Sequence, residues 1–326
     1  MDAVLGLDTS CYTTSAALCG PGEPRQARRL LPVPAGERGL RQSEAVFAHV
    51  RQIADQVSAV MKDAAAPIDC ICASASPRDG GDSYMPVFQV GVSHARVLAA
   101  ALHVPLYLTT HQRGHIRAAQ YGTGLQSDRF VALHLSGGTT DVLLHDGEAL
   151  TPLGGSMDLH AGQLVDRIGV KLGLPFPCGP HLEKLARRVA AQGALPVSMV
   201  KNSVACHLSG AEAQLLRRIE RGARPEDAAA DVYSLLCRTV LRMLSAAAEA
   251  AGTRDMLLAG GVASSALLRE MLMERNEKRR LGLRLYFGRP EFSGDNAVGA
   301  ALIGLERHRK EARSHGDAAG RENHCG

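Results

Sequence analysis

Two stretches of the chain share one order of apolar and polar positions: an apolar run, a short polar turn and a second apolar run. In the first half the runs cover 3–8 and 13–18, and in the second half they cover 130–135 and 141–145. Two β-like runs joined by a short polar turn are typical of a hairpin whose tip can contact a ligand. The repeat therefore predicts two similar hairpins, one in each half of the chain.

The remaining elements follow from apolar spacing, with a period near 3.6 for helices and short apolar runs for buried strands. This spacing predicts helices at 42–64, 88–102, about 158–173, 180–192, 208–221, 226–251, 264–275 and 296–309. Strands are predicted at 70–75, 104–108, 255–259 and 283–287, with a weak strand within 20–40. The polar tail at 310–326, interrupted by glycines, is predicted to be disordered.

Each predicted hairpin is followed by helices and further strands, which indicates a loose internal duplication of one α/β unit. Two α/β lobes that each open with a phosphate-binding hairpin are the plan of the actin, sugar-kinase and heat-shock ATPase superfamily. We therefore predict an α/β, two-lobed actin-like ATPase (ASKHA) fold with duplicated lobes and a cleft between them. The expected divisions are an N-terminal lobe at 1–123, joined by a C-terminal helix at about 295–310, a C-terminal lobe at 124–294, and a disordered tail at 311–326.

Composition narrows the function classes without choosing among them. Aromatic residues make up 4% of the 326 residues and there is no Trp, which argues against a surface that stacks nucleic-acid bases. The net charge of +4 permits a nucleic-acid partner but does not require one. The chain has no signal-peptide pattern and no apolar run approaching about 18 residues, so we expect a cytoplasmic protein with reduced cysteines and no membrane association.

The two predicted hairpin tips carry the residue types of a phosphate site. Glycines let a backbone approach a phosphate closely, and successive N–H groups with hydroxyls form an anion nest. An ordinary hairpin turn is the alternative for the second tip, but the matching polar tip in the first half favours phosphate binding. The residues assigned to the nucleotide are Ser136, Gly137, Gly138 and Thr139 of the second tip, with Asp8, Thr9 and Ser10 of the first.

Four further residues are candidates for contacts with the nucleoside. Gly260 and Gly261 lie between a predicted strand and a helix, where N–H groups at the helix N-terminus point outward. Gly179 lies between two predicted helices, and Asp166 could accept hydrogen bonds from ribose hydroxyls. Gly260 and Gly261 have a tight strand-to-helix turn as the structural alternative, and Asp166 has a solvated or capping role.

A metal site is indicated by His111 and His115, which lie one turn apart on a predicted helix directly after a strand. The alternative is one core and one surface histidine. Asp295 precedes the last predicted helix and is a third candidate ligand, with helix capping as its alternative role. Two imidazoles and a carboxylate with open coordination positions suit iron or zinc.

Six motifs in this order resemble the TsaD family, the bacterial threonylcarbamoyl-adenosine synthases also labelled O-sialoglycoprotein endopeptidases. The motifs are LGLDTSCYTTSAAL, HQRGHIRAA, SGGTT, LGLPFPCGPHLEKLA, AGGVASSALLR and FSGDNAVGAALIG. The resemblance spans residues 3 to about 304. It implies transfer of a threonylcarbamoyl group from its adenylate to the adenosine beside the anticodon of certain tRNAs.

The resemblance also implies partners and site residues. His111, His115 and Asp295 match the family's metal ligands, and the loop from His134 and Leu135 to Gly138 matches substrate-binding positions. Iron is the first choice of metal and zinc the second. ATP or an acyl-adenylate, tRNA, and a TsaB-like partner or a homodimer are the implied ligands and partners.

The chain departs from the family pattern at several positions. Tyr12 and Thr13 replace two carboxylates that follow the Cys in the family's first motif. Other departures are Leu159 for Asp, Gln163 for Glu, Glu212 for Lys, Ser265 for Asn (Ser265 staying among the candidate substrate contacts) and a longer stretch at 77–86. A site built for particular hydrogen-bond donors discriminates against partners that lack the match. These changes predict a diverged paralogue with an altered acceptor.

Three functions fit these observations. The first is carbamoyl-type transfer to tRNA or to a small molecule, as in related O-carbamoyltransferases, by direct attack because no nucleophile is evident; the catalytic residue is unknown. The second is a non-catalytic subunit like TsaB, whose chains lack the paired histidines found here. The third is a kinase or ATPase, which would leave the histidines unexplained because Mg-ATP sites use carboxylates and water.

Overall fold

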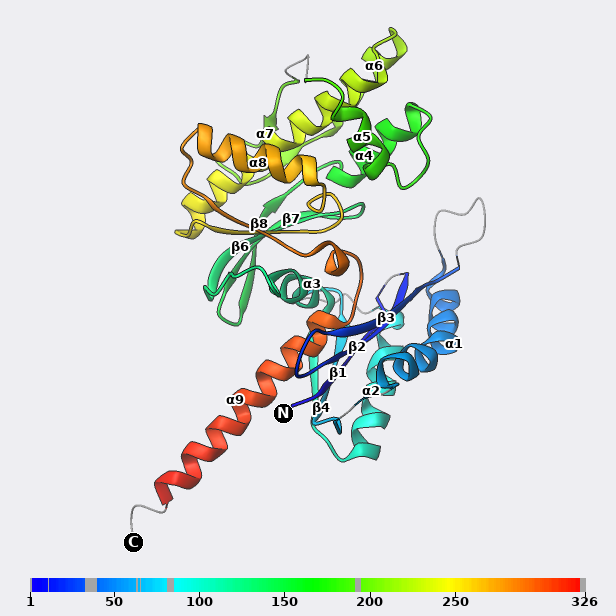
Figure 1. Ribbon diagram of the computed structural model, residues 1–326, viewed down its shortest axis with the longest axis vertical. Coiled ribbons are helices and arrows are strands. Elements are labelled where there is room, and N and C mark those ends of the chain that lie inside the picture. The colour runs from blue at the N-terminus through cyan, green and yellow to red at the C-terminus, as the bar shows by residue number, and fades with distance from the viewer. Residues whose placement is uncertain are drawn as a thin grey trace. The chain divides into compact units, whose positions relative to one another are not determined.

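Both halves of the chain fold around a five-stranded mixed sheet in the computed structural model (Figure 1). The structure describes residues 2–10, 12–32, 40–62, 64, 66–80, 85–190 and 195–322. Two compact units result, Met1–Ala118 with Asp295–Gly326, and Ala119–Gly294. Cys11, residues 81–84 of the altered stretch and residues 323–326 of the expected tail lie outside the described residues.

The sheet of the first unit has the strand order β3-β2-β1-β4-β5. Its strands are β1 Val4–Asp8, β2 Thr13–Cys19, β3 Arg25–Leu30, β4 Cys70–Ser76 and β5 Leu106–Thr110. The helices that belong to it are α1 Gln42–Met61, α2 Pro86–Leu102, the start of α3 His111–Gln120, and α9 Val298–Glu322. Strand β1 is antiparallel to β2 and parallel to β4.

Strand β1 separates the two packed faces of this sheet. Leu5 and Leu7 belong to an apolar cluster with residues of α1 and α2, and burying a leucine contributes roughly 1.5–3 kcal/mol. Gly6 points to the other face, where a Cβ atom would lie 2.5 Å from the carbonyl oxygen of Ala297 and 2.7 Å from the Ala301 nitrogen. Helix α9 therefore packs its backbone directly against the strand, and only glycine fits at this contact.

The sheet of the second unit has the order β12-β11-β6-β7-β8. Its strands are β6 Arg129–Leu135, β7 Thr140–Asp146, β8 Ala149–Gly155, β11 Asp255–Ala259 and β12 Arg284–Phe287, with a separate two-stranded ribbon of β9 Ser198–Met199 and β10 Cys206–His207. Its helices are α4 Ala161–Lys171, α5 Gly179–Ala186, α6 Ser209–Glu220, α7 Pro225–Ala251, α8 Ala266–Lys278 and the short η1 Pro290–Phe292.

The two sheets confirm the predicted duplication. Strand β6 is antiparallel to β7 and parallel to β11, as β1 is to β2 and β4, so each half repeats one strand order. The sequence prediction missed β8, the counterpart of β3. This edge strand carries Pro152 and is largely exposed, so it lacks the alternating apolar pattern that identifies half-buried strands.

The last helix is longer than the sequence predicts. A helix at 296–309 and a disordered tail were expected, whereas α9 covers Val298–Glu322. A glycine inside a helix costs only about 1 kcal/mol relative to alanine, so the glycines of the tail do not have to end it. Among the helices of the described residues, none combines the length and apolar character needed to cross a bilayer.

Asp158 ties the segment after β8 to the start of α6. Its Oδ1 accepts from the Leu208 N–H at 2.9 Å, and its Oδ2 accepts from the Ser209 hydroxyl at 2.5 Å. Burial raises the pKa of Asp158, but these bonds outweigh it and hold the pKa at about 2. The carboxylate therefore stabilises the fold above pH 4, and this contribution disappears as the pH falls from about 4 to 2.

We expect Asp158→Asn to lower the free energy of unfolding by about 1 kcal/mol at pH 6, a value reduced for the partial solvent exposure of the group. The difference from the unchanged chain should shrink at pH 3, where the carboxyl group of the unfolded chain is already largely protonated. Urea unfolding at both pH values measures this. A difference that stays constant with pH would show that the charge of Asp158 is not involved.

Candidate metal and nucleotide sites

Two histidines converge at the start of α3 in the first unit. Strand β5 ends at Thr110 and α3 begins at once with His111, so His111 and His115 lie one turn apart on one helix face. Their Nε2 atoms are 2.9 Å apart. The side chains are 14% and 10% exposed, which places both imidazoles in a nearly closed environment.

Asp295 joins the two histidines because α9 begins against α3. A Cβ atom on Gly299 would lie on the carbonyl oxygen of Gly114, so the backbones of the two helices are in contact at this point. Asp295 Oδ1 lies 3.3 Å from His115 Nε2 and 3.5 Å from His111 Nε2. Three donor atoms from segments far apart in the sequence therefore meet within 4.8 Å of one another.

Asp295 does not cap the last helix, which corrects its alternative role in the sequence analysis. Helix α9 begins at Val298, and the Val298 N–H donates to Asn296 Oδ1 at 3.0 Å. The second oxygen of Asp295, Oδ2, accepts from the Thr13 hydroxyl at 3.2 Å. The carboxylate is thus oriented by a residue that replaces a carboxylate of the family pattern.

Asp8 fixes the orientation of His111. The carboxylate is 1% exposed, and its Oδ2 lies 2.9 Å from His111 Nδ1. A carboxylate only accepts hydrogen bonds, so Nδ1 carries the proton and Nε2 faces His115 and Asp295. Carboxylate, imidazole and a metal position in this order form the arrangement that orients histidine ligands in metalloproteins.

The electrostatics of the cluster favour a positive charge where the donors converge. Burial lowers the pKa of His111, but the carboxylates of Asp8 and Asp295 outweigh it and raise the pKa well above the usual value. Burial raises the pKa of Asp295, and the two histidines instead hold it well below its usual range.

The donor set fits one transition-metal ion. Two ligand atoms about 2.1 Å from one ion and at right angles are roughly 3.0 Å apart. The three donor separations of 2.9, 3.3 and 3.5 Å are close to this value, so the donors could share an ion with little movement. Imidazole with carboxylate suits iron or zinc, whereas magnesium prefers oxygen ligands alone.

We expect Asp8→Asn to weaken iron or zinc binding by about 10- to 100-fold, because it removes the acceptor that holds the His111 tautomer. Isothermal titration of the metal-free chain with zinc measures the affinity. The matched control is Asp79→Asn, because Asp79 is a carboxylate of the same unit that pairs with Arg113. Equal zinc affinity in the two variants would contradict the role assigned to Asp8.

The second unit contains a hollow of about 410 Å³ next to its hairpin tip. Gly137 of the tip, Gly162 and Asp166 of α4, and Ser265 at the start of α8 line it. The remaining lining residues are Val165, Pro177, Gly179, Pro180, Glu183, Tyr233, Gly261, Val262 and Ser264. A hollow of this size, with few polar groups, is typical of a small-ligand site.

Close backbone packing shapes this hollow. A Cβ atom on Gly162 would lie 2.6 Å from the nitrogen of Gly137, so the hairpin tip rests on the N-terminus of α4. Gly260 has a φ of +96°, and a Cβ atom there would collide with the Leu135 carbonyl oxygen. By contrast, Cβ atoms on Gly137 and Gly138 would meet nothing within 4 Å, which leaves the backbone of the tip open to a ligand.

Gly137→Val should therefore leave the fold intact and fill part of the hollow. We expect it to weaken binding of a non-hydrolysable ATP analogue about tenfold or more, since a lost close contact of this kind costs over 1.4 kcal/mol. Gly138→Val is the matched control, because Gly138 has equal free space but does not line the hollow. If both variants bind the analogue as the unchanged chain does, the nucleotide lies elsewhere.

The polar side chains of the hollow have partners inside the unit. Asp166 Oδ1 accepts from the Cys178 N–H at 2.9 Å, and Ser265 Oγ accepts from the Leu268 N–H at 3.2 Å as the cap of α8. Glu183 Oε1 accepts from the Leu267 N–H at 2.9 Å, and the Tyr233 hydroxyl donates to the Gly179 carbonyl at 3.2 Å. These bonds hold the wall of the hollow in one arrangement.

The structure brings together only part of the residues assigned to the nucleotide. Gly137, Asp166, Gly179, Gly261 and Ser265 share the hollow. Gly260 supports it through its turn, and the remaining assigned residues of the second unit are absent from its lining: His134, Leu135, Ser136, Gly138 and Thr139.

The side chains of the first hairpin tip are buried, and phosphate binding at this tip stays a prediction. Thr9 and Ser10 are fully buried, and the Thr9 hydroxyl donates to the Val87 carbonyl at 2.8 Å. Asp8 lies behind His111, so these side chains support the metal cluster and α2. Sequence patterns do not predict this role of Asp8 or the lining residues Glu183 and Tyr233, although Glu183 lies in the motif LGLPFPCGPHLEKLA.

Comparison with known proteins decides the family. The profile of the TsaD family, described as tRNA N6-adenosine threonylcarbamoyltransferase, matches residues 36–302. The chain belongs to the TsaD family. It is 32% identical over 282 residues to the tRNA N6-adenosine threonylcarbamoyltransferase of Methanopyrus kandleri, covering 85% of this chain and 79% of the relative.

A second relative of this TsaD-family chain is longer. The chain is 27% identical over 313 residues to a probable bifunctional tRNA threonylcarbamoyladenosine biosynthesis protein of Thermoplasma volcanium. The match covers 95% of this chain and 57% of the relative. The TsaD-family chain therefore corresponds to a little over half of that protein.

Solved structures confirm the actin-like ATPase fold. HypF of T. kodakarensis superposes with a TM-score of 0.60 at 17% identity, over 95% of this chain and 48% of HypF. A full-length HypF in the phosphate- and nucleotide-bound form gives 0.62 at 11% identity, over 94% and 55%. A ROK family glucokinase from Streptomyces griseus, in complex with glucose and AMPPNP, gives 0.54 at 13% identity, over 93% and 99%.

Proposed function

We propose that this TsaD-family chain transfers the threonylcarbamoyl group from its adenylate to an adenosine of tRNA, with a metal ion held by His111, His115 and Asp295. The observation that carries the proposal is the convergence of these three donors, with Asp8 orienting His111 from behind. Iron is the first candidate for the ion and zinc the second.

The first unit would supply the metal and its support. A bound ion would act as a Lewis acid on a phosphate or carbamoyl oxygen of the adenylate. His111 and His115 present Nε2, Asp295 presents Oδ1, and Asp8 keeps the proton of His111 on Nδ1. The Thr13 hydroxyl occupies Asp295 Oδ2, which leaves Oδ1 directed at the ion.

The hollow of the second unit is suited to the adenosine part of a nucleotide. Its hollow has an exposed backbone at Gly137 and a carboxylate at Asp166, whose second oxygen would accept from a ribose hydroxyl. Support comes from the similar folds of HypF in its nucleotide-bound form and of a glucokinase with AMPPNP. The chain would bind and orient the adenylate. The tRNA amine would attack the carbamoyl carbon directly, forming a C–N bond as the C–O bond to the phosphate breaks, so that AMP leaves and the amine gives up one proton to solvent.

Residues that depart from the family pattern have local partners in this chain. Gln163 Oε1 accepts from the His160 N–H at 3.1 Å at the start of α4. Glu212 Oε1 lies 3.3 Å from Arg167 Nη1, and Leu159 is buried in the core. We propose that these substitutions alter which tRNAs are accepted.

Incubation of the chain with threonylcarbamoyl-adenylate and a tRNA transcript tests the proposal, with nucleoside mass analysis as the readout. The expected product is one adenosine per tRNA that carries the added threonylcarbamoyl mass. A transcript with inosine at that position is the control, because inosine lacks the amine. Binding of the adenylate with no product on any tRNA would contradict the proposed acceptor.

A further inference from the structure

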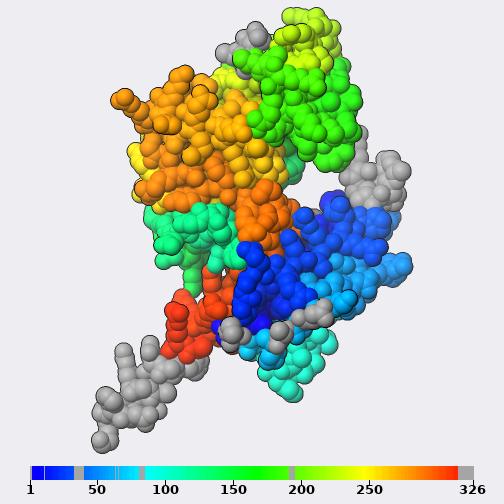
Figure 2. Space-filling view, viewed as in Figure 1, coloured from blue at the N-terminus to red at the C-terminus, as the bar shows by residue number. Residues whose placement is uncertain are grey.

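A group of five basic side chains lies on the α7–α8 face of the second unit, outside the nucleotide hollow. We call it the basic groove and define it by Arg238 and Arg242 of α7 and Arg275, Lys278 and Arg279 at the end of α8. The residues of α8, coloured orange, form part of the surface of this unit (Figure 2). Glu274 is the one carboxylate among the residues that line the groove.

The cations of the groove have no carboxylate partner within 4 Å among the residues that the structure describes. Arg238 donates to the Ser234 carbonyl and Arg242 to the Val197 carbonyl, while Arg238 Nη2 is buried with no hydrogen-bond partner. Other arginines of this unit are paired, for example Arg187 with Glu270 and Arg284 with Asp255. The groove therefore concentrates uncompensated positive charge.

The positive charges also act on one another. Burial lowers the pKa of Arg238, and the neighbouring Arg275 and Arg242 lower it further. The side chains facing Arg238 from α7 and α8 are thus mainly of the same sign, with Asp231 as a weaker opposing charge. A bound anion would relieve this repulsion.

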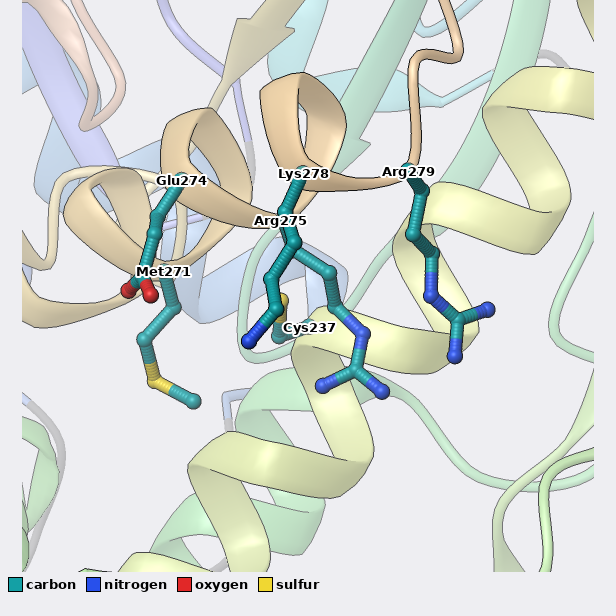
Figure 3. Close-up of a pocket in the computed structure, with 6 residues that line it drawn as sticks. All are labelled: Cys237, Met271, Glu274, Arg275, Lys278 and Arg279. Atoms are coloured by element: carbon teal, nitrogen blue, oxygen red, sulfur yellow. The ribbon is translucent and has the colours of Figure 1, made fainter.

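The groove consists of adjoining hollows that share basic residues. Two hollows of about 420 and 380 Å³ both include Arg275 and Arg279 in their walls, and Arg242 also borders a third hollow with Lys201. In Figure 3, Arg275, Lys278 and Arg279 project from α8 to the same side, and the Glu274 carboxylate lies apart from them beside Met271. Adjacent hollows that share basic walls suit a chain of repeated anions.

We infer that the basic groove binds the phosphate backbone of an RNA. Arginine forks match phosphate oxygens, and lysine adds a point charge. No aromatic residue lines either hollow, so the contacts would follow the backbone and not stack on bases. An apolar protein partner is disfavoured because charged side chains dominate the walls.

Helix α8 links the groove to the nucleotide hollow within one unit. Ser265 caps α8 and lines the hollow, whereas Arg275 and Lys278 lie near the other end. The 13 residues of α8 span about 20 Å at roughly 1.5 Å per residue. An RNA several nucleotides long would reach from one site to the other. The inference thus rests on the proposed tRNA acceptor and adds the surface that holds it.

The test compares charge reversals by fluorescence anisotropy with a labelled tRNA transcript, over a range of salt concentrations. For Arg275→Glu with Lys278→Glu we expect at least about tenfold weaker tRNA binding near 100 mM salt and a salt slope smaller by about two. Arg217→Glu on α6 with Arg221→Glu directly after it is the matched control, because it changes the net charge equally at exposed positions. Its affinity should stay within about threefold.

The outcomes separate the groove from the proposed function. Equal weakening of tRNA binding in the two double variants, or none in either, would contradict RNA binding by the basic groove. The proposed tRNA transfer would be unaffected. If the unchanged chain binds poly(U) through the groove but binds no tRNA, RNA binding by the groove is supported and tRNA as the acceptor is contradicted. Failure to bind either RNA would overturn both. Thermal melting and affinity for an ATP analogue, both expected unchanged, show that the variants are folded.

Discussion

His115→Ala is expected to lower threonylcarbamoyl transfer to tRNA by about a thousandfold at limiting metal, since Lewis-acid assistance is worth several kcal/mol. The substitution removes one of three donors and leaves His111 Nδ1 paired with Asp8. His111→Ala would be a poorer choice, because it leaves the buried Asp8 carboxylate without its partner, a strongly destabilising change. Metal content by elemental analysis and single-turnover transfer rates measure the effect.

The control for His115→Ala is His94→Ala. His94 lies on α2 of the same unit, where its Nδ1 is 2.8 Å from the Val90 carbonyl oxygen, and it is not part of the metal cluster. We expect this variant to bind one metal per chain and to transfer at an unchanged rate. Transfer that survives His115→Ala with less metal bound would show that the cluster is not part of the reaction.

Gly299→Ala is expected to destabilise the first unit by about 3 kcal/mol, because overpacking against an unyielding backbone has no cheap relaxation. The added methyl group would occupy the position of the Gly114 carbonyl oxygen. It would force α9 away from α3, and with it Asp295 from the histidines. Urea unfolding measures the stability, and zinc titration measures the accompanying loss of affinity.

Gly114→Ala on the facing helix is the control. A Cβ atom there meets only the Ala300 nitrogen, at 3.7 Å, which is an ordinary contact. Alanine also favours the helix by roughly 0.5–1 kcal/mol over glycine, so this variant should be as stable as the unchanged chain or more so. Similar losses of stability in both variants would contradict the specific contact of Gly299 with the Gly114 carbonyl oxygen.

The features that the sequence predicts correctly are those set by residues close together in the chain. Both hairpins and the pairing of His111 with His115 depend on neighbours a few residues apart, so spacing alone indicates them. Strand β8 was missed because an exposed edge strand with Pro152 carries no apolar alternation. The glycines of the tail predict that the helix ends before it, but single glycines inside a helix are tolerated at modest cost.

Long-range contacts explain what the sequence did not predict. Asp8 and His111 are 103 positions apart, and only the parallel sheet of the first unit brings them together. A short polar turn after a strand equally suits a phosphate loop or a buried support for another side chain. In the structure, the side chain of Asp8 supports His111 and that of Thr9 supports α2. Likewise, the walls of the hollow in the second unit come from α4, α5, α7 and α8, and the apolar spacing within each helix does not predict how these helices pack together.

The most direct test of the metal-dependent transfer is a titration of the metal-free chain with ferrous ion or zinc, followed by single-turnover transfer to tRNA. Transfer should rise with bound metal and reach its plateau at one ion per chain, and His115→Ala should need far more metal for the same rate. Transfer at the full rate from a chain with no measurable metal would contradict the role proposed for His111, His115 and Asp295.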